Sequence, residues 1–134
     1  PLDDFLEEAR SGLDRVDPAD LADALADGAL VVDHRDTADR TAEGAIPGSI
    51  HIPRSILEWR LAPTSRWRSH HLAEDDRVVL VCNDGYSSSV AAATLQRLGL
   101  GGATDLVGGY RAWLAWATGD VHRLGYSAPR GGHE

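Results

Sequence analysis

Hydrophobic residues follow two different patterns along the chain. Apolar positions at helical spacing predict helices in five segments: 2–13, 17–26, 55–61, 90–98 and 110–117. Short continuous apolar runs predict buried strands in four others: 29–33, 50–52, 77–82 and 103–107. The strongest strand pattern is the run at 77–82, and an equally strong helical pattern follows it at 90–98. The polar segment 36–43 predicts one or two further helical turns.

Turn and capping residues separate these segments. Asp17 and Pro18 are the residue types expected at the start of a helix, and Gly28 follows where that helix should end. Because strands and helices alternate with short connections, the sequence predicts an α/β fold. We expect a parallel sheet with helices on both faces, which is a three-layer α/β/α arrangement.

Length and composition fit one domain. The chain has 134 residues, of which 43% are hydrophobic, enough for one core. We therefore expect a single domain over residues 1–122. From Arg123 onward Gly, Pro and Ser are frequent, so residues 123–134 are expected to form a flexible C-terminal tail.

The formal net charge of −8 limits the kinds of partner. An acidic surface repels phosphate backbones, so we expect no nucleic-acid partner. Any anion site must be built locally, from backbone amides or a few arginines. Apolar runs such as Val78–Cys82 are far shorter than the ~20 residues that cross a bilayer, so no membrane partner is expected.

The chain has one cysteine, Cys82, so no disulfide can form within it. This fits a reducing compartment, and we expect a cytoplasmic location, although a secreted protein without disulfides would have the same composition. A lone thiol also has no second cysteine in the chain to resolve it.

Cys82 ends the strongest predicted strand, where open α/β sheets place their ligands. The loop Asn83-Asp84-Gly85-Tyr86 follows, and a helix then begins at Ser87-Ser88. Amide groups of such a loop and the helix dipole favour a thiolate, which is the nucleophilic form of cysteine. A cysteine at this place is often only a small core residue. The loop and helix after it form an anion cradle that a core residue would not need.

Three stretches of the sequence resemble the signatures of the rhodanese family. The first is Leu30-Val-Val-Asp-His-Arg35 with Glu43-Gly-Ala-Ile-Pro-Gly-Ser-Ile-His-Ile-Pro53, and the second is the loop from Cys82 to Ser88. The third runs from Leu98-Gly through Asp105-Leu-Val-Gly-Gly-Tyr-Arg-Ala-Trp113. They span residues 17–118 in the order and spacing of the family.

The resemblance implies a five-stranded parallel sheet and sulfur transfer through a persulfide on Cys82. Thiosulfate or another persulfide would be the donor, and cyanide, a thiol or a protein would be the acceptor. No cofactor beyond the covalent persulfide is implied. A sulfur carrier or docking module without turnover is the alternative, and a homodimer is compatible with either.

A phosphatase or arsenate reductase of the same fold ranks last. The resemblance implies that such phosphatases have one more residue in the loop and close it with an arginine. Here Ser87 stands where arginine is frequent, and Asp84 adds negative charge to the rim. Without a bidentate guanidinium, phosphate binding is weaker. The same two residues predict that thiosulfate is a poorer donor than a neutral or protein-borne persulfide.

Several charged residues are candidates for a supporting role. We expect Asp33 to accept hydrogen bonds from the loop amides and Arg35 to pair with Glu43, both as structural contacts. Arg40 and Arg54 are the arginines most expected at the pocket mouth. No metal site is expected, because the adjacent histidines at 70 and 71 have no second ligand cluster at metal spacing.

Overall fold

The computed structural model describes residues 1–70, 72 and 76–119, so the predicted tail at 123–134 and the histidine at 71 lie outside the described residues. The helices of the described part are α1 (Leu2–Ser11), α2 (Leu21–Ala26), α3 (Thr37–Glu43), α4 (Leu57–Leu61), α5 (Ser87–Arg97) and α6 (Gly109–Thr118). The strands are β1 (Leu30–Asp33), β2 (Ile50–His51), β3 (Val78–Val81) and β4 (Ala103–Asp105). Short 3-10 turns at Pro18–Asp20 and Arg54–Ile56 lead into α2 and α4.

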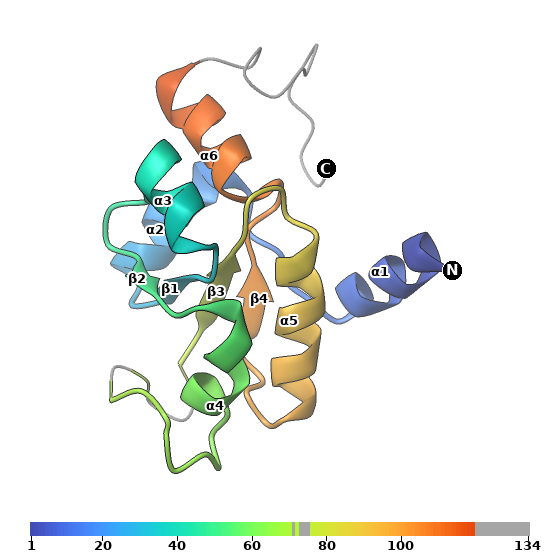
Figure 1. Cartoon of the computed structure of the whole chain (residues 1–134). Coiled ribbons are helices and arrows are strands. Elements are labelled where there is room, and N and C mark those ends of the chain that lie inside the picture. Colours follow the sequence, from blue (N-terminus) through green and yellow to red (C-terminus); the bar gives the residue numbers. More distant parts are fainter. Residues whose placement is uncertain (71, 73–75, 120–134) are drawn as a thin grey trace.

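The four strands form one parallel sheet in the order β2-β1-β3-β4 (Figure 1). The expected fifth strand is not among the described residues. Its place beside β4 is taken by a single parallel bridge between Val16 and Leu106. Pro18, two residues later, has no amide hydrogen to donate and begins a 3-10 turn, so the extended segment stops there.

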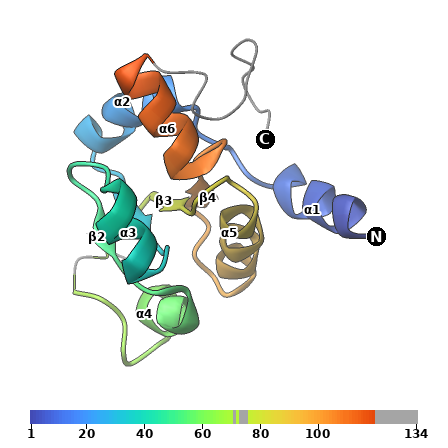
Figure 2. The ribbon, with the colours of Figure 1, turned by 45° about the horizontal axis from the view of Figure 1, so that its top comes forward.

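Alternate residues of β1 and β3 face opposite layers, as a sheet buried on both faces requires. Val32, Val78 and Leu80 pack in one core cluster, to which α4 and α5 contribute. Val31 and Val79 pack in the second cluster, to which α2 and α6 contribute. With the top of the molecule turned forward, α4 and α5 lie on one side of the strands and α2 and α6 on the other (Figure 2). The predicted three-layer α/β/α architecture is confirmed.

Helix α1 lies apart from these layers, beside α5 (Figure 1). It has no buried residue, and Leu2 and Phe5 are 76% and 54% exposed. Its periodicity predicts a helix, yet its apolar face is not part of either core cluster among the described residues. Packing of the main core therefore does not hold α1 in place.

Asp33, at the carboxyl end of β1, is 1% exposed and holds a buried ion pair. Its carboxylate accepts hydrogen bonds from Arg35 Nη2 at 2.7 Å and from Arg40 Nε at 3.2 Å, and it also accepts one from the Arg35 amide at 3.0 Å. Burial alone would raise the pKa of Asp33, but the hydrogen bonds and charge of Arg35, followed by the hydrogen bond from Arg40, outweigh it and lower the pKa. The ionised carboxylate is thus part of the folded structure.

Asp33→Asn should destabilise the protein by about 3–5 kcal/mol at neutral pH, because Arg35 is left buried without its counter-charge. A carboxylate whose pKa is lowered on folding stabilises the protein above its unfolded value of 3.8, and this stabilisation is lost as the pH falls through the folded value. The difference between wild type and variant, measured by urea unfolding, should therefore shrink as the pH falls below about 4.

Glu43→Gln is the control, because the Glu43–Arg111 pair is partly exposed. The Glu43 side chain is 24% exposed and the Arg111 side chain is 34% exposed. Loss of this pair should cost no more than about 1 kcal/mol. A wild-type advantage over Asp33→Asn that stays constant down to acid pH would show that the charge on Asp33 does not stabilise the fold.

Candidate functional site

Cys82 follows β3, and its sulfur is turned toward the loop that comes after it. The Cys82 Sγ accepts hydrogen bonds from the amides of Gly85 at 3.1 Å and Ser88 at 3.4 Å. Gly85 has a φ of +86°, a conformation that lets the loop curl back over the sulfur. Although Cys82 is 6% exposed, it lines a pocket, so the sulfur is not enclosed among aliphatic groups. This is the arrangement of amides around one sulfur that the sequence predicts.

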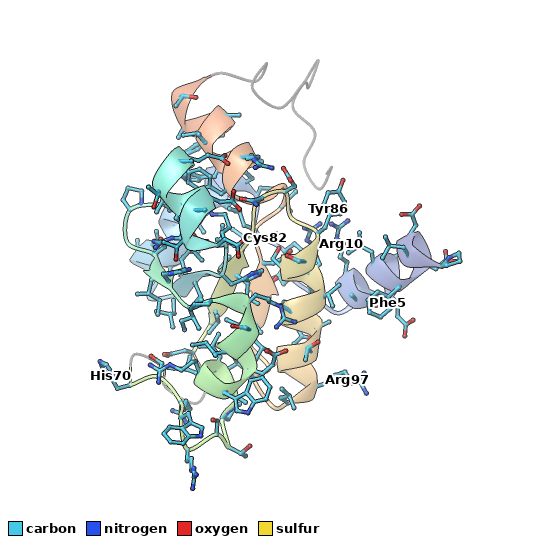
Figure 3. The ribbon with its side chains drawn as sticks, viewed as in Figure 1. Phe5, Arg10, His70, Cys82, Tyr86 and Arg97 are labelled. Carbon is cyan, nitrogen blue, oxygen red and sulfur yellow. The ribbon has the colours of Figure 1, made fainter. Side chains whose placement is uncertain are left out.

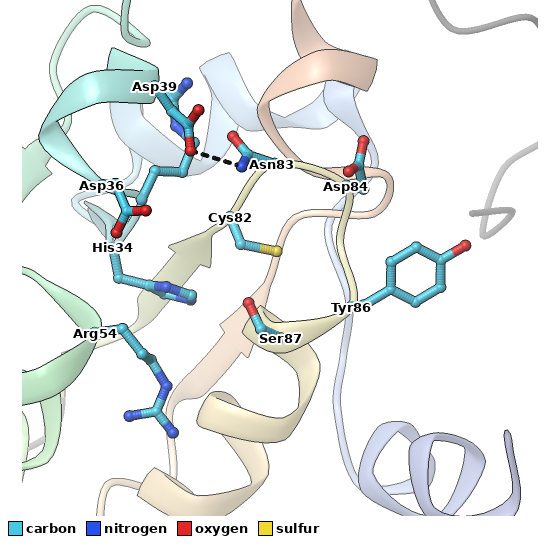
Figure 4. Close-up of a pocket in the computed structure, with 10 residues that line it drawn as sticks. His34, Asp36, Asp39, Arg54, Cys82, Asn83, Asp84, Tyr86 and Ser87 are labelled. Carbon is cyan, nitrogen blue, oxygen red and sulfur yellow. Dashed lines mark hydrogen bonds between the residues drawn. The ribbon is translucent and has the colours of Figure 1, made fainter. Parts of the chain in front are cut away.

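The pocket beside the sulfur has a volume of about 320 Å³. Its walls come from three parts of the chain: the segment after β1, the start of the turn before α4, and the cysteine loop (Figure 4). The lining residues are His34, Arg35, Asp36, Asp39, Arg54, Cys82, Asn83, Asp84, Tyr86 and Ser87. The pocket therefore contains one candidate nucleophile, two arginines and three carboxylates.

Beneath the loop, a hydrogen-bonded chain leads from the sulfur to a buried carboxylate. The Cys82 thiol lies 3.2 Å from Ser88 Oγ, and Ser88 Oγ donates to Asp105 Oδ2 at 2.7 Å. Ser89 Oγ donates to the same oxygen at 2.7 Å, and Arg15 Nε donates to Asp105 Oδ1 at 2.8 Å. Asp105 is fully buried, and these donors compensate its charge. The hydroxyl of Ser88 is thus oriented by Asp105.

The N-terminus of α6 fixes the other side of the loop. The amides of Tyr110 and Arg111 donate to the carbonyls of Cys82 at 2.8 Å and of Asn83 at 3.1 Å. Gly109 has a φ of +68°, and a Cβ there would lie 2.6 Å from both carbonyl oxygens. Gly109, the second glycine of the pair in the third signature, is therefore required by the close approach of α6 to the cysteine loop.

The sequence interpretation missed three residues of the pocket, Asp36, Asp39 and His34, and His34 is the buried one among them. It is 4% exposed, and its Nε2 has no hydrogen-bond partner among the described residues. Burial, followed by the positive charge of Arg54, lowers the pKa of His34 to about 4, so the ring is neutral at pH 7. The alternation of side chains along an extended segment could have found it, since His34 must face away from the paired Asp33 and Arg35.

The structure corrects two expected contacts. Arg35 does not pair with Glu43: its Nη2 bonds Asp33 at 2.7 Å and the Gly44 carbonyl at 2.7 Å, and its guanidinium lies 3.9 Å from the centre of the Tyr110 ring. Glu43 pairs with Arg111 instead, at 3.0 Å. Asp33, in turn, bonds arginines rather than the loop amides.

The remaining candidates divide between the pocket and its surroundings. Arg54 lines the pocket and pairs with Glu58 at 2.8 Å, whereas Arg40 bonds Asp33 and is not a lining residue. Asn83 Nδ2 donates to Asp39 Oδ2 at 3.1 Å (Figure 4). Tyr86 is 49% exposed and lies at the rim.

No group of three or more histidine, cysteine, aspartate or glutamate side chains is placed to hold a metal ion in the part of the chain that the structure describes. None of the described helices is both long enough and apolar enough to span a bilayer.

The fold and loop define an α/β protein with one cysteine at the centre of an amide-lined loop. The sequence profile of the rhodanese-like domain matches residues 17–115, and the chain belongs to the rhodanese-like domain family. The predicted resemblance is thereby confirmed.

Curated relatives agree with this family. A chloroplastic protein of Arabidopsis thaliana named thiosulfate sulfurtransferase 16 is 30% identical over 104 residues, covering 72% of this chain and 87% of its own length. The human thiosulfate:glutathione sulfurtransferase is 30% identical over 110 residues, covering 78% and 96%. A Bacillus subtilis protein, YrkF, named as a candidate sulfur carrier, is 32% identical over 68 residues, or 51% of this chain, which spans 32% of its length.

Solved structures show the same fold. A protein of unknown function from Rhodopseudomonas palustris, described as a possible tyrosine phosphatase, superposes with a TM-score of 0.79 at 32% identity, covering 87% of this chain and 91% of its own. A human single-domain sulfurtransferase has a TM-score of 0.61 at 28% identity, covering 75% and 94%.

Gly109→Ala tests whether α6 holds the cysteine loop. Gly119→Ala is the matched control, because Gly119 has a similar φ of +73° but nothing within 4 Å of an added Cβ. We expect the control to cost about 1 kcal/mol from its backbone conformation. Gly109→Ala should cost about 1–3 kcal/mol more, because the loop carbonyls must move.

Thermal unfolding and the rate of Cys82 alkylation measure the two effects. Only Gly109→Ala should alter the alkylation rate, since only that change displaces the loop. Equal losses of stability in both variants would mean that α6 and the loop are not tightly coupled.

Proposed function

We propose that this chain is a sulfurtransferase in which Cys82 carries sulfane sulfur as a persulfide. The observation that carries the proposal is the pair of amide hydrogen bonds from Gly85 and Ser88 to the Cys82 Sγ, at the wall of an open pocket. Amide hydrogens directed at a sulfur stabilise its negative charge before and after sulfur transfer. The family and the names of two curated relatives support the same chemistry.

The first half-reaction is a displacement on the outer sulfur of a donor such as thiosulfate. The Cys82 thiolate attacks that sulfur, a new S–S bond forms, and the S–S bond of thiosulfate breaks. Sulfite leaves with the electron pair, and Cys82 retains the outer sulfur as a persulfide. The step needs no cofactor, because the sulfur is carried covalently.

The second half-reaction returns the enzyme to its starting state. Cyanide or a thiolate attacks the outer sulfur of the persulfide, and the electron pair of the broken S–S bond returns to Cys82. The products are thiocyanate or the persulfide of the acceptor. The human relative is named for glutathione, and this supports a thiol as the acceptor.

One arginine of the pocket can meet an anionic donor, although Asp36 and Asp39 also line the pocket. Asp84, which adds negative charge to the rim, pairs with Arg111 at 2.9 Å. Arg54 lines the pocket, and its side chain is 39% exposed, so it can meet the oxygens of thiosulfate. Ser87 stands where a loop arginine is frequent in the family, which disfavours phosphate esters as substrates.

Intact-mass measurement after incubation with thiosulfate tests the proposal directly. The wild type should gain ~32 Da, the mass of one sulfur atom, and lose it on treatment with cyanide or dithiothreitol. Cys82→Ser should gain nothing.

Thiocyanate formation from thiosulfate and cyanide then separates an enzyme from a carrier that loads without turnover, and a phosphate-ester assay tests the phosphatase alternative. A Cys82 that neither gains sulfur nor reacts with alkylating agents would overturn the proposal.

Arg54→Gln should raise the KM for thiosulfate by about threefold to tenfold with little change in kcat, because it removes one charge-assisted hydrogen bond to the donor. Glu58→Gln is the complementary control. It removes the carboxylate that pairs with Arg54 and should leave the KM unchanged or lower it. If both variants retain the wild-type KM, Arg54 does not contact the donor.

A further inference from the structure

The carbonyl oxygen of Gly85, in the middle of the cysteine loop, is held by two arginines. Arg10 Nη2 donates to it at 2.8 Å and Arg15 Nη2 at 3.2 Å. Both arginines precede residue 17, where the match to the family profile begins. Two of the side-chain contacts to this carbonyl therefore come from a part of the chain that lies outside the recognised domain, and a third, from Ser89 Oγ at 3.2 Å, comes from within it.

The direction of that carbonyl fixes the direction of the next amide. The Gly85 C=O and the Tyr86 N–H belong to one planar trans peptide unit, in which they point in opposite directions. Because the carbonyl faces Arg10 and Arg15 behind the loop, the Tyr86 amide hydrogen points away from these arginines, and Tyr86 itself lines the pocket. No acceptor among the described residues bonds this amide.

Further contacts keep both arginines in position. Arg10 Nε donates to Ser89 Oγ at 3.0 Å, and the Arg10 guanidinium lies 5.7 Å from the centre of the Tyr86 ring. Arg15 is paired with the buried Asp105 through two hydrogen bonds, at 2.8 and 3.2 Å. Each arginine is thus fixed by a second contact before it reaches the Gly85 carbonyl.

Helix α1 brings Arg10 to this place. The helix lies beside α5, and Arg10 is at the end of α5 where the cysteine loop enters, close to Tyr86 (Figure 3). Gln96 Nε2 donates to the Gly12 carbonyl at 3.1 Å and holds the end of the same segment. Since α1 has no buried residue, polar contacts of this kind attach it to the domain.

We propose that Arg10 and Arg15 are positioning residues: they hold the Gly85 carbonyl away from the pocket and thereby direct the Tyr86 amide at the outer sulfur of the donor and of the persulfide. This inference deepens the proposed function and rests on it for the identity of the bound sulfur. The N-terminal segment, through Arg10 and Arg15, then fixes the conformation of the cysteine loop. An amide hydrogen directed into the pocket stabilises a bound anion or a sulfur atom that carries partial negative charge.

Arg10→Met tests the proposal, because it keeps most of the side-chain length. It removes the Nε donor to Ser89 and the Nη2 donor to the Gly85 carbonyl. Arg97→Met is the matched control: Arg97 lines the groove between α1 and α5 but lies at the opposite end of α5 (Figure 3). The two changes remove the same charge from the same pair of helices. Arg10→Lys restores the charge with a single ammonium in place of the guanidinium fork.

The measurement is the ratio of the alkylation rates of Cys82 with iodoacetate, an anion, and with iodoacetamide, which is neutral. We expect Arg10→Met to lower this ratio by about threefold to tenfold, because the anion loses one hydrogen bond from the Tyr86 amide. Arg97→Met should keep the wild-type ratio, and Arg10→Lys should give an intermediate one. A role in stability alone would change both rates by the same factor and leave the ratio unchanged.

The outcomes separate this inference from the proposed function, because alkylation does not require sulfur transfer. A lowered ratio in Arg10→Met, in a protein that gains no sulfur from thiosulfate, would support the positioning role and contradict the sulfurtransferase. A wild-type ratio in a folded Arg10→Met that still forms a persulfide would overturn the positioning role alone. An equal fall in Arg10→Met and Arg97→Met would also overturn it, as a general effect of charge. Circular dichroism and the Tm establish that each variant is folded.

Discussion

The orientation of a few peptide units after Cys82 is the constraint on which the site depends. Amides of Gly85 and Ser88 point inward to the sulfur, while carbonyls of the same short loop point outward. Each outward carbonyl needs a donor, because a buried oxygen without one is costly. Helix α6 supplies donors for Cys82 and Asn83, and two arginines supply them for Gly85. The neighbours of the loop thus maintain its inward amides.

The same constraint explains why distant parts of the sequence resemble the family together. Gly109, at the start of α6, lies 27 residues beyond the cysteine in the chain, yet it approaches the loop so closely that an added Cβ would lie 2.6 Å from the carbonyl oxygens of Cys82 and Asn83. The segment after β1 provides the opposite wall through His34 and Arg35. The parallel sheet brings these segments to one edge because all its strands end there.

Much of the fold follows from local patterns, and the parts that do not have identifiable physical reasons. The strands at 30–33 and 78–81 and the helix from Ser87 are predicted because their apolar residues are continuous or periodic. The fifth strand was expected from the family and is absent from the described residues, since Pro18 leaves Val16 only one bridge. The periodicity of residues 2–13 predicts a helix but does not identify α5 as its neighbour.

The cysteine loop could be predicted from the sequence, whereas its support could not. Spacing indicates which residues follow Cys82, but Arg10 and Asp105 reach the loop only through the tertiary structure. The expected pairing of Arg35 with Glu43 does not form, because Arg35 bonds Asp33 and the Gly44 carbonyl. Arg111 lies much further along the chain and is the actual partner of Glu43, because Tyr110 and Arg111 at the start of α6 both bond Glu43 at the end of α3.

The hydrogen bonds from α6 to the loop also link the motion of the two. The amide hydrogens of Tyr110 and Arg111 are protected only while the carbonyls of Cys82 and Asn83 remain in place. Any fluctuation that uncovers the sulfur from this side must therefore release those two hydrogens to exchange with solvent. The deuterium uptake of these two amides thus measures how often the cysteine loop opens in the resting protein. This measurement does not require a label on the thiol.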